Sequence, residues 1–468
     1  MILYGRLNKK IDRRRIDRQH LVVNKDSTKM TISHHLANRQ NVLQAPLIEL
    51  EARLEAVAAS FHDEWLSAGV HPMQILWSRR DVLATNQLIW FGDAILNMRA
   101  IDTSWTQREL SKVKSQPANV RKGAAFELLG LNMLSQHQRV VPTAAGTPGY
   151  DGIAYLPDGG RMALSLKNYG TSTHEQVVQQ HGAALETILT NVLRTLGKNG
   201  VDLRVIARQN PSSADWERLK TCLPEIIASD PQIPGNAYQD TNWTVIVRRL
   251  AGVDARPSAS LSYQITILAP LHANEHQNLI SKLDEASANA ERHARGEADL
   301  CHAVMVHLPE NASLDGCNQW AQTYFAERPD GPIDLVILYQ PSVASLNGSQ
   351  ASAIVHAMQC VEGPRYNTWS KPHGGKRRRV GISFYVGIVS GSSSRLILKN
   401  DLGQSLAGDQ WYLFQSGHLY QVVEPGPNGV VDIKLSNPAP GLFRHALGPD
   451  GTELRGIFPP SSDLLIFT

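Results

Sequence analysis

The sequence predicts an α/β protein whose central segment runs helix, strand, strand, strand, helix, strand. This order rests on apolar residues at helical spacing, then short apolar segments separated by turns, and then a long amphipathic stretch. A strand, helix, strand unit implies a right-handed crossover that brings its two strands together in parallel. The expected elements are a helix at 120–137, strands at 140–145, 150–156 and 162–169, a helix at 173–196 and a strand at 203–207.

The first of these helices carries an acid, Glu127, in the middle of its apolar pattern. Two strong turn signals, Gly-Thr-Pro-Gly at 146–149 and Pro-Asp-Gly-Gly at 157–160, then separate the three short strands. The helical face itself is indicated by Ala124, Leu128, Leu131 and Leu134.

An acid, a second acid and a lysine follow one another along this segment. Asp151 begins the second strand, and Ser165-Leu166-Lys167 lies in the third. Side chains alternate between the faces of a strand, so Ser165 and Lys167 share one face and Leu166 points to the other. Hydrolysis of a phosphodiester requires charge neutralisation on the phosphate and an activated water, which Mg²⁺ held by carboxylates provides. The residue types fit that chemistry.

Residues 120–208, roughly a fifth of the chain, resemble the PD-(D/E)xK nuclease superfamily. Lys-Gly-Ala-Ala-Phe-Glu at 122–127 is similar to the family's first-helix glutamate segment, and Gly-Tyr-Asp-Gly at 149–152 to its metal-binding aspartate. Ser-Leu-Lys at 165–167 takes the place of its (D/E)xK. Because Ser165 replaces the second carboxylate, the metal site is one acid short at this position.

The resemblance implies a restriction-endonuclease-like αβββαβ core and a Mg²⁺- or Mn²⁺-dependent nuclease acting on DNA. It implies that Asp151 is the main metal ligand, joined by Glu127 and the backbone carbonyl of Leu166. Lys167 would orient or deprotonate the attacking water and stabilise the transition state. Ser165 could hold a metal-bound water. A role in restriction, defence or mobile elements, and assembly as a homodimer, are further expectations by analogy.

Three residues at the start of the crossover helix are secondary candidates. Glu175 could replace the missing acid, although Ser172 with Glu175 also fits a helix capping box. Gln176 and Gln180 lie one turn apart, and RecB-like relatives carry a glutamine near the site on this helix. A solvated helix face explains the two glutamines equally well.

The rest of the chain divides by its composition and periodicity. Residues 1–40 form a basic arm, which either contacts phosphates or is a solvated leader without function. The remaining regions are a helical domain at 41–115, the nuclease core at 116–210, an α/β extension at 211–345 and a β-rich C-terminal region, a small barrel or sandwich, at 346–468. In this last region strands are expected at 380–388, 396–398, 411–414, 419–423, 430–435 and 464–467.

The loop at 371–379 holds the densest basic cluster after the arm. Its glycines would let the backbone approach a phosphate, and its cations would give affinity without sequence preference. A surface loop kept soluble by charge is the alternative. The candidate contacts for nucleic acid are Lys376, Arg377, Arg378 and Arg379.

Composition excludes several other classes. The 468 residues, 42% of them hydrophobic, suffice for a large core, and a net charge of +3 confines nucleic-acid affinity to local patches. Four widely separated cysteines argue against a zinc site or a disulfide scaffold. The absence of a long apolar run argues against a membrane protein and favours the cytoplasm. Two alternatives to the nuclease stay open: a non-catalytic nucleic-acid-binding or assembly protein with a degenerate nuclease fold, and an α/β protein whose charged residues are ordinary surface features.

Overall fold

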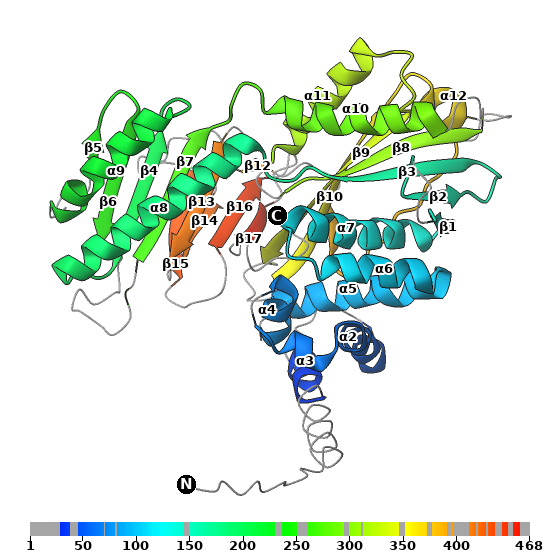
Figure 1. Ribbon diagram of the computed structural model, residues 1–468, viewed down its shortest axis with the longest axis horizontal. Coiled ribbons are helices and arrows are strands. Elements are labelled where there is room, and N and C mark those ends of the chain that lie inside the picture. The colour runs from blue at the N-terminus through cyan, green and yellow to red at the C-terminus, as the bar shows by residue number, and fades with distance from the viewer. Residues whose placement is uncertain are drawn as a thin grey trace, which may run out of the picture.

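The computed structural model of the chain is a mixed α/β protein with two mixed sheets flanked by helices (Figure 1). The residues that the structure describes are 29–37, 45–69, 71–79, 82–144, 149–229, 236–249, 261, 263–293, 299–309, 312–345, 352–371, 377–390, 395–396, 411–417, 420–426, 429–435, 442–447 and 453–458. Most of the predicted basic arm and the strand expected at 464–467 lie outside them.

The larger sheet begins with an antiparallel meander and continues in parallel. Strands β1, β2 and β3 pair antiparallel in turn, after which β3, β8 and β9 are parallel neighbours. Strand β10 then pairs antiparallel with β9. The bounds are β1 Arg139–Pro142, β2 Gly152–Tyr155, β3 Arg161–Asn168, β8 Leu300–His307, β9 Leu335–Ser345 and β10 Ser352–Glu362.

The smaller sheet has five strands in the order β13, β7, β4, β6, β5. Helices α8 (Thr173–Leu196) and α9 (Ser213–Ala228) cover one face, where Leu189 and Trp216 pack with Leu203 of β4. The strands are β4 Val201–Ala207, β5 Asn236–Gln239, β6 Trp243–Arg249, β7 Tyr263–Pro270 and β13 Trp411–Gly417.

The central segment contains the predicted elements, but its last strand pairs elsewhere. The expectation that the strand at 203–207 returns beside β3 is wrong, because β4 pairs with β6 and β7 in the smaller sheet. The parallel neighbour of β3 is β8, which follows helix α10 (His276–His293). A local strand, helix, strand pattern does not specify which sheet the strand enters. The apolar face of β4 is satisfied by α8 and α9 instead.

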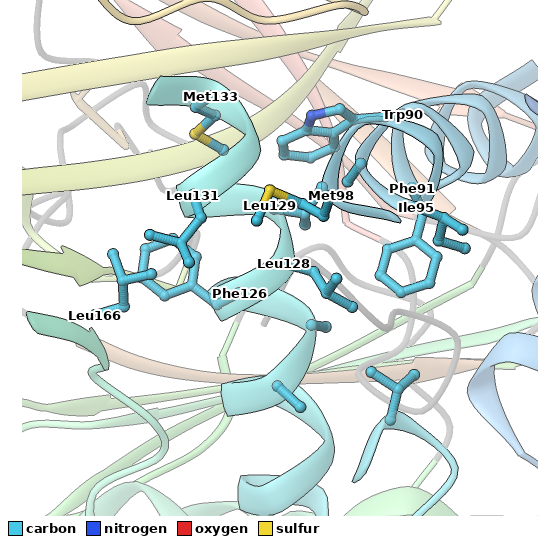
Figure 2. Close-up of a cluster of buried hydrophobic side chains, with 14 of the residues drawn as sticks. Trp90, Phe91, Ile95, Met98, Phe126, Leu128, Leu129, Leu131, Met133 and Leu166 are labelled. Carbon is cyan, nitrogen blue, oxygen red and sulfur yellow. The ribbon is translucent and has the colours of Figure 1, made fainter. Parts of the chain in front are cut away.

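A helical layer precedes the larger sheet and packs on one of its faces. Helix α7 (Ala118–Ser135) contacts β3 directly, while α5 (Val82–Ile101) and α6 (Thr103–Val113) cover the outside of α7. Figure 2 shows the apolar side chains of α5 facing those of α7, with Leu166 of β3 on the sheet side. The remaining helices of this layer are α2 Leu47–Phe61, α3 Asp63–Leu66 and α4 Pro72–Ser78.

The opposite face of the larger sheet is covered by a second helical layer. Helices α10 and α11 (Leu314–Glu327) pack there around Val304 and Val306 of β8 (Figure 1). A short helix, α12 (Tyr366–Ser370), follows β10 and contacts β8. The layers place α7 and α10 on opposite sides of β3.

The C-terminal strands extend existing sheets rather than closing into a barrel or sandwich of their own. Strand β13 joins β7, and β17 (Glu453–Phe458) joins β9, followed by β16 (Leu442–Leu447) and β12 (Arg395–Leu396). A separate hairpin is formed by β14 (Tyr420–Gly426) and β15 (Gly429–Leu435).

One of the strands expected in the C-terminal region is absent from its predicted place. Residues 380–387 are not a strand, and β11 (Ile388–Ser390) begins at their end. Their apolar side chains pack on the main core, and Ser383 donates its backbone N–H to Met133 at 2.9 Å, so no partner strand is required. Among the described helices, none has the length and apolarity needed to cross a bilayer.

Candidate active site

Asp151 is fixed at the start of β2 by backbone contacts on both sides. Its N–H donates to the Leu164 carbonyl at 2.7 Å, and its carbonyl accepts from Thr143 N at 2.9 Å. Its side-chain Oδ2 accepts the backbone N–H of Leu166 at 2.6 Å. Asp151 therefore continues the β2–β3 pairing by one residue before Gly152. Its carboxylate, rather than a backbone carbonyl, accepts the N–H of Leu166.

The Leu166 carbonyl points toward the same edge as this carboxylate. Backbone groups of alternate strand residues face the same neighbour, and both Leu164 and Leu166 use this side of β3 to contact Asp151. Strand β2 does not extend that far, since its ladder with β3 stops at Gly152 opposite Leu164. The Leu166 carbonyl and the Asp151 carboxylate are thus neighbouring oxygen donors.

Glu127 lies on α7, where the charge of Asp151 acts on it. Burial, the charge of Asp151 and the charge of Glu109 together raise the pKa of Glu127 to about 8, against an opposing effect of Lys112. The pKa of Asp151 is also raised, mainly by burial, although the Leu166 N–H and the charge of Lys167 act against the rise. The raised pKa of Glu127 favours its protonated form at neutral pH.

Glu109 of α6 is a third acid at this place, and sequence reasoning missed it. Its side chain is fully buried, hydrogen-bonds to Glu127, and pairs with Lys112 at 2.9 Å and Arg108 at 3.0 Å. Nothing in the sequence around Glu109 indicates a functional residue, since it lies within a polar helix. Glu109 comes close to Glu127 only because α6 packs on α7.

Lys167 lies on the other face of β3 from Glu127. The Leu166 side chain packs toward Gly130 of α7, so Ser165 and Lys167 face the α10 layer. Lys167 Nζ donates to Glu285 Oε1 of α10 at 2.8 Å, and this hydrogen bond lowers the pKa of Glu285. The Lys167 charge still acts on Asp151 and opposes the rise in its pKa.

Charge effects thus link Asp151 with Glu127 and with Lys167, whereas Ser165 is buried on the α10 face. Glu285 was not predicted either. It lies more than a hundred residues after Lys167 in the chain, and it comes to the site because α10 rather than α8 covers this face of β3.

The secondary candidates on α8 have other contacts. Ser172 Oγ accepts the backbone N–H of Glu175 at 3.1 Å as the helix cap, and the Glu175 charge acts on Lys122. Gln176 donates to the Thr171 carbonyl at 3.1 Å, and Gln180 is exposed.

The basic loop is engaged in intramolecular ion pairs where it is described. Arg377 pairs with Glu362 at 2.8 Å. Arg378 pairs with Asp158 at 3.0 Å, is 7% exposed and lies over the Trp369 ring. Arg379 is exposed, and Lys376 lies outside the described residues. Arg378 therefore joins the β2–β3 turn to the loop, which limits its availability to a ligand.

The donors at Asp151 fit a hard divalent cation. Carboxylates and a backbone carbonyl are the oxygen ligands that Mg²⁺ accepts, and Mg²⁺ usually keeps several waters rather than a complete protein cage. The charge of Asp151 raises the pKa of Glu127, and a cation near both carboxylates would relieve this repulsion. Within the described ranges, no three His, Cys, Asp or Glu side chains form a ready-made metal cage.

Comparisons of the sequence and the structure with known proteins identify no relative of this chain. The chain matches no family model, no curated protein sequence and no solved structure at a significant level.

Proposed function

We propose that this protein is a Mg²⁺- or Mn²⁺-dependent nuclease that hydrolyses phosphodiester bonds in DNA. The observation that carries the proposal is the electrostatic environment of Asp151, whose charge acts on Glu127 and is itself favoured by the charge of Lys167. The order α7, β1, β2, β3, α10, β8, with β3 parallel to β8, supports a restriction-endonuclease-like αβββαβ core into which α8–β7 is inserted.

Asp151, Glu127 and the Leu166 carbonyl would hold the metal ion. When bound, the ion would neutralise charge on the scissile phosphate and make a coordinated water more acidic. Lys167 would orient the attacking water and stabilise charge in the transition state. Ser165 and Glu285 lie on the Lys167 face, where Glu285 holds the ammonium and supplies the negative charge that Ser165 lacks.

The test is a cleavage assay of the full chain on supercoiled and linear DNA. We expect cleavage with Mg²⁺ or Mn²⁺, none with EDTA, and none in Asp151→Ala or Lys167→Ala. Asp330→Ala removes an exposed carboxylate elsewhere and should cleave normally. Cleavage that survives both site variants would overturn the proposal.

A non-catalytic nucleic-acid-binding or assembly protein is the second candidate, and two observations favour it. Ser165 leaves one acid fewer than the family pattern has, and Lys167 is already paired with Glu285 at 2.8 Å. Salt-sensitive DNA binding without cleavage under all metal conditions would select this function.

A further inference from the structure

A small cavity lies between helices α5 and α7 and strands β8 and β9 of the larger sheet, and Asp151 does not line it. Its volume is about 10 Å³, enough for one water-sized molecule. Its walls are mainly apolar, but a lysine of α7 and a histidine at the end of β8 both line it. The lining residues are Trp90, Lys122, Ala125, Phe126, Leu129, His307 and Tyr339.

His307 presents an unused lone pair in this cavity. Asn168 Oδ1 accepts the backbone N–H of Gly170 at 3.3 Å, so the same oxygen, 3.4 Å from His307 Nδ1, requires a proton on Nδ1. Nε2 is then an acceptor. It is buried and has no hydrogen-bond partner among the described residues. A molecule in the cavity that donates a hydrogen bond to Nε2 would satisfy this buried acceptor.

Lys122 is a largely buried amine. Burial, reinforced by the charge of Arg121, lowers its pKa to about 8, while Glu175 opposes this shift. His307 does not compete for protons at neutral pH, because burial and the charge of Lys122 lower its own pKa to about 3. About a tenth of Lys122 is therefore the free amine at pH 7, and this form is nucleophilic.

We propose that Lys122 is a covalent modification site for small carbonyl compounds, which occupy the cavity that it shares with His307. The amine nitrogen attacks the carbonyl carbon to give a carbinolamine, whose hydroxyl can donate to His307 Nε2. Loss of one water then leaves an imine. The apolar walls protect the imine from hydrolysis, and a cavity the size of one water restricts the compound to a single carbon.

The test is limited reductive methylation of the native full-length chain with formaldehyde and cyanoborohydride, followed by peptide mass spectrometry. At pH 7 we expect Lys122 to be modified at least about tenfold faster than the exposed Lys371, because burial lowers the pKa of Lys122 and increases its share of free amine. The rate at Lys122 should level off above about pH 8. Lys122→Arg removes the labelled peptide and confirms its assignment.

Glu175→Gln tests whether the charge of Glu175 controls the reactivity of Lys122. Removing the carboxylate that raises the pKa of Lys122 should increase its rate at pH 7 by roughly two- to threefold without affecting Lys371. Equal rates at Lys122 and Lys371, or labelling of Lys122 only in urea, would overturn the proposal. DNA cleavage is not measured, so this outcome is independent of the proposed nuclease function.

Discussion

Leu166 donates its backbone N–H to the Asp151 carboxylate at 2.6 Å, which ties the second strand of the meander to the third at the point where their ladder ends. A charge-assisted bond of this kind both orients the carboxylate and favours its ionised form. The position of Asp151 is thus set by the backbone of β3 and not by its neighbouring side chains.

Asp151→Asn should separate folding from chemistry. The amide oxygen can still accept the Leu166 N–H, while the negative charge available to a metal is removed. We expect a melting temperature close to that of the parent and a loss of DNA cleavage of about 100-fold or more, corresponding to several kcal/mol of electrostatic stabilisation. Calorimetry and a gel assay measure the two effects. Retained cleavage with normal metal dependence would contradict this role.

Glu127→Gln should stabilise the metal-free protein at alkaline pH. The folded-state pKa of about 8 lies above the ordinary glutamate value, so stability declines as pH rises from about 4.5 to 8 and is lowest above 8. Glutamine removes this decline. The gain in unfolding free energy should be of the order of 2 kcal/mol at pH 9 and near zero at pH 4.5, measured by urea unfolding in EDTA. A gain that is the same at both pH values would exclude titration of Glu127 as the cause.

Metal affinity should increase with pH up to about 8. A cation that binds Glu127 must displace its proton, so the apparent affinity rises by up to about tenfold per pH unit below that value. Titration of Mn²⁺ by calorimetry at pH 6, 7 and 8 measures the slope. Glu127→Gln should abolish the slope and weaken binding, whereas an unchanged slope would place the proton on another group.

Two glycines of α7 provide a matched pair of substitutions. A Cβ at Gly130 would lie 3.1 Å from Leu166 Cδ2, so the Leu166 side chain must shift by a few tenths of an ångström, and we expect Gly130→Ala to be less stable than Gly123→Ala. A Cβ at Gly123 meets nothing within 4 Å, so Gly123→Ala should stabilise the helix by about 0.5–1 kcal/mol with unchanged cleavage. Both are measured by thermal unfolding. Equal effects would show that the packing of α7 on β3 is looser than described.

The elements of the core could be predicted from the sequence because their signals are local. The helix carrying Glu127 and the strands carrying Asp151 and Lys167 follow from periodicity and turn residues, and the structure has them within a few residues of the expected bounds. Strand partners depend on contacts across more than a hundred residues, so the pairing of β3 with β8 was missed. Glu109 and Glu285 were missed for the same reason, since only tertiary packing brings them to the site.

The pairing of β13 with β7 has a consequence for synthesis of the chain. Residues 264–270 of β7 are synthesised before their outer partner, residues 411–417, which follow more than a hundred residues later in the chain. Until then β7 presents a row of unpaired amides and carbonyls that can dock with another nascent copy. A chain whose synthesis stops before Trp411 would therefore be prone to aggregation through the open edge of β7. A chaperone would protect the nascent chain most during this interval.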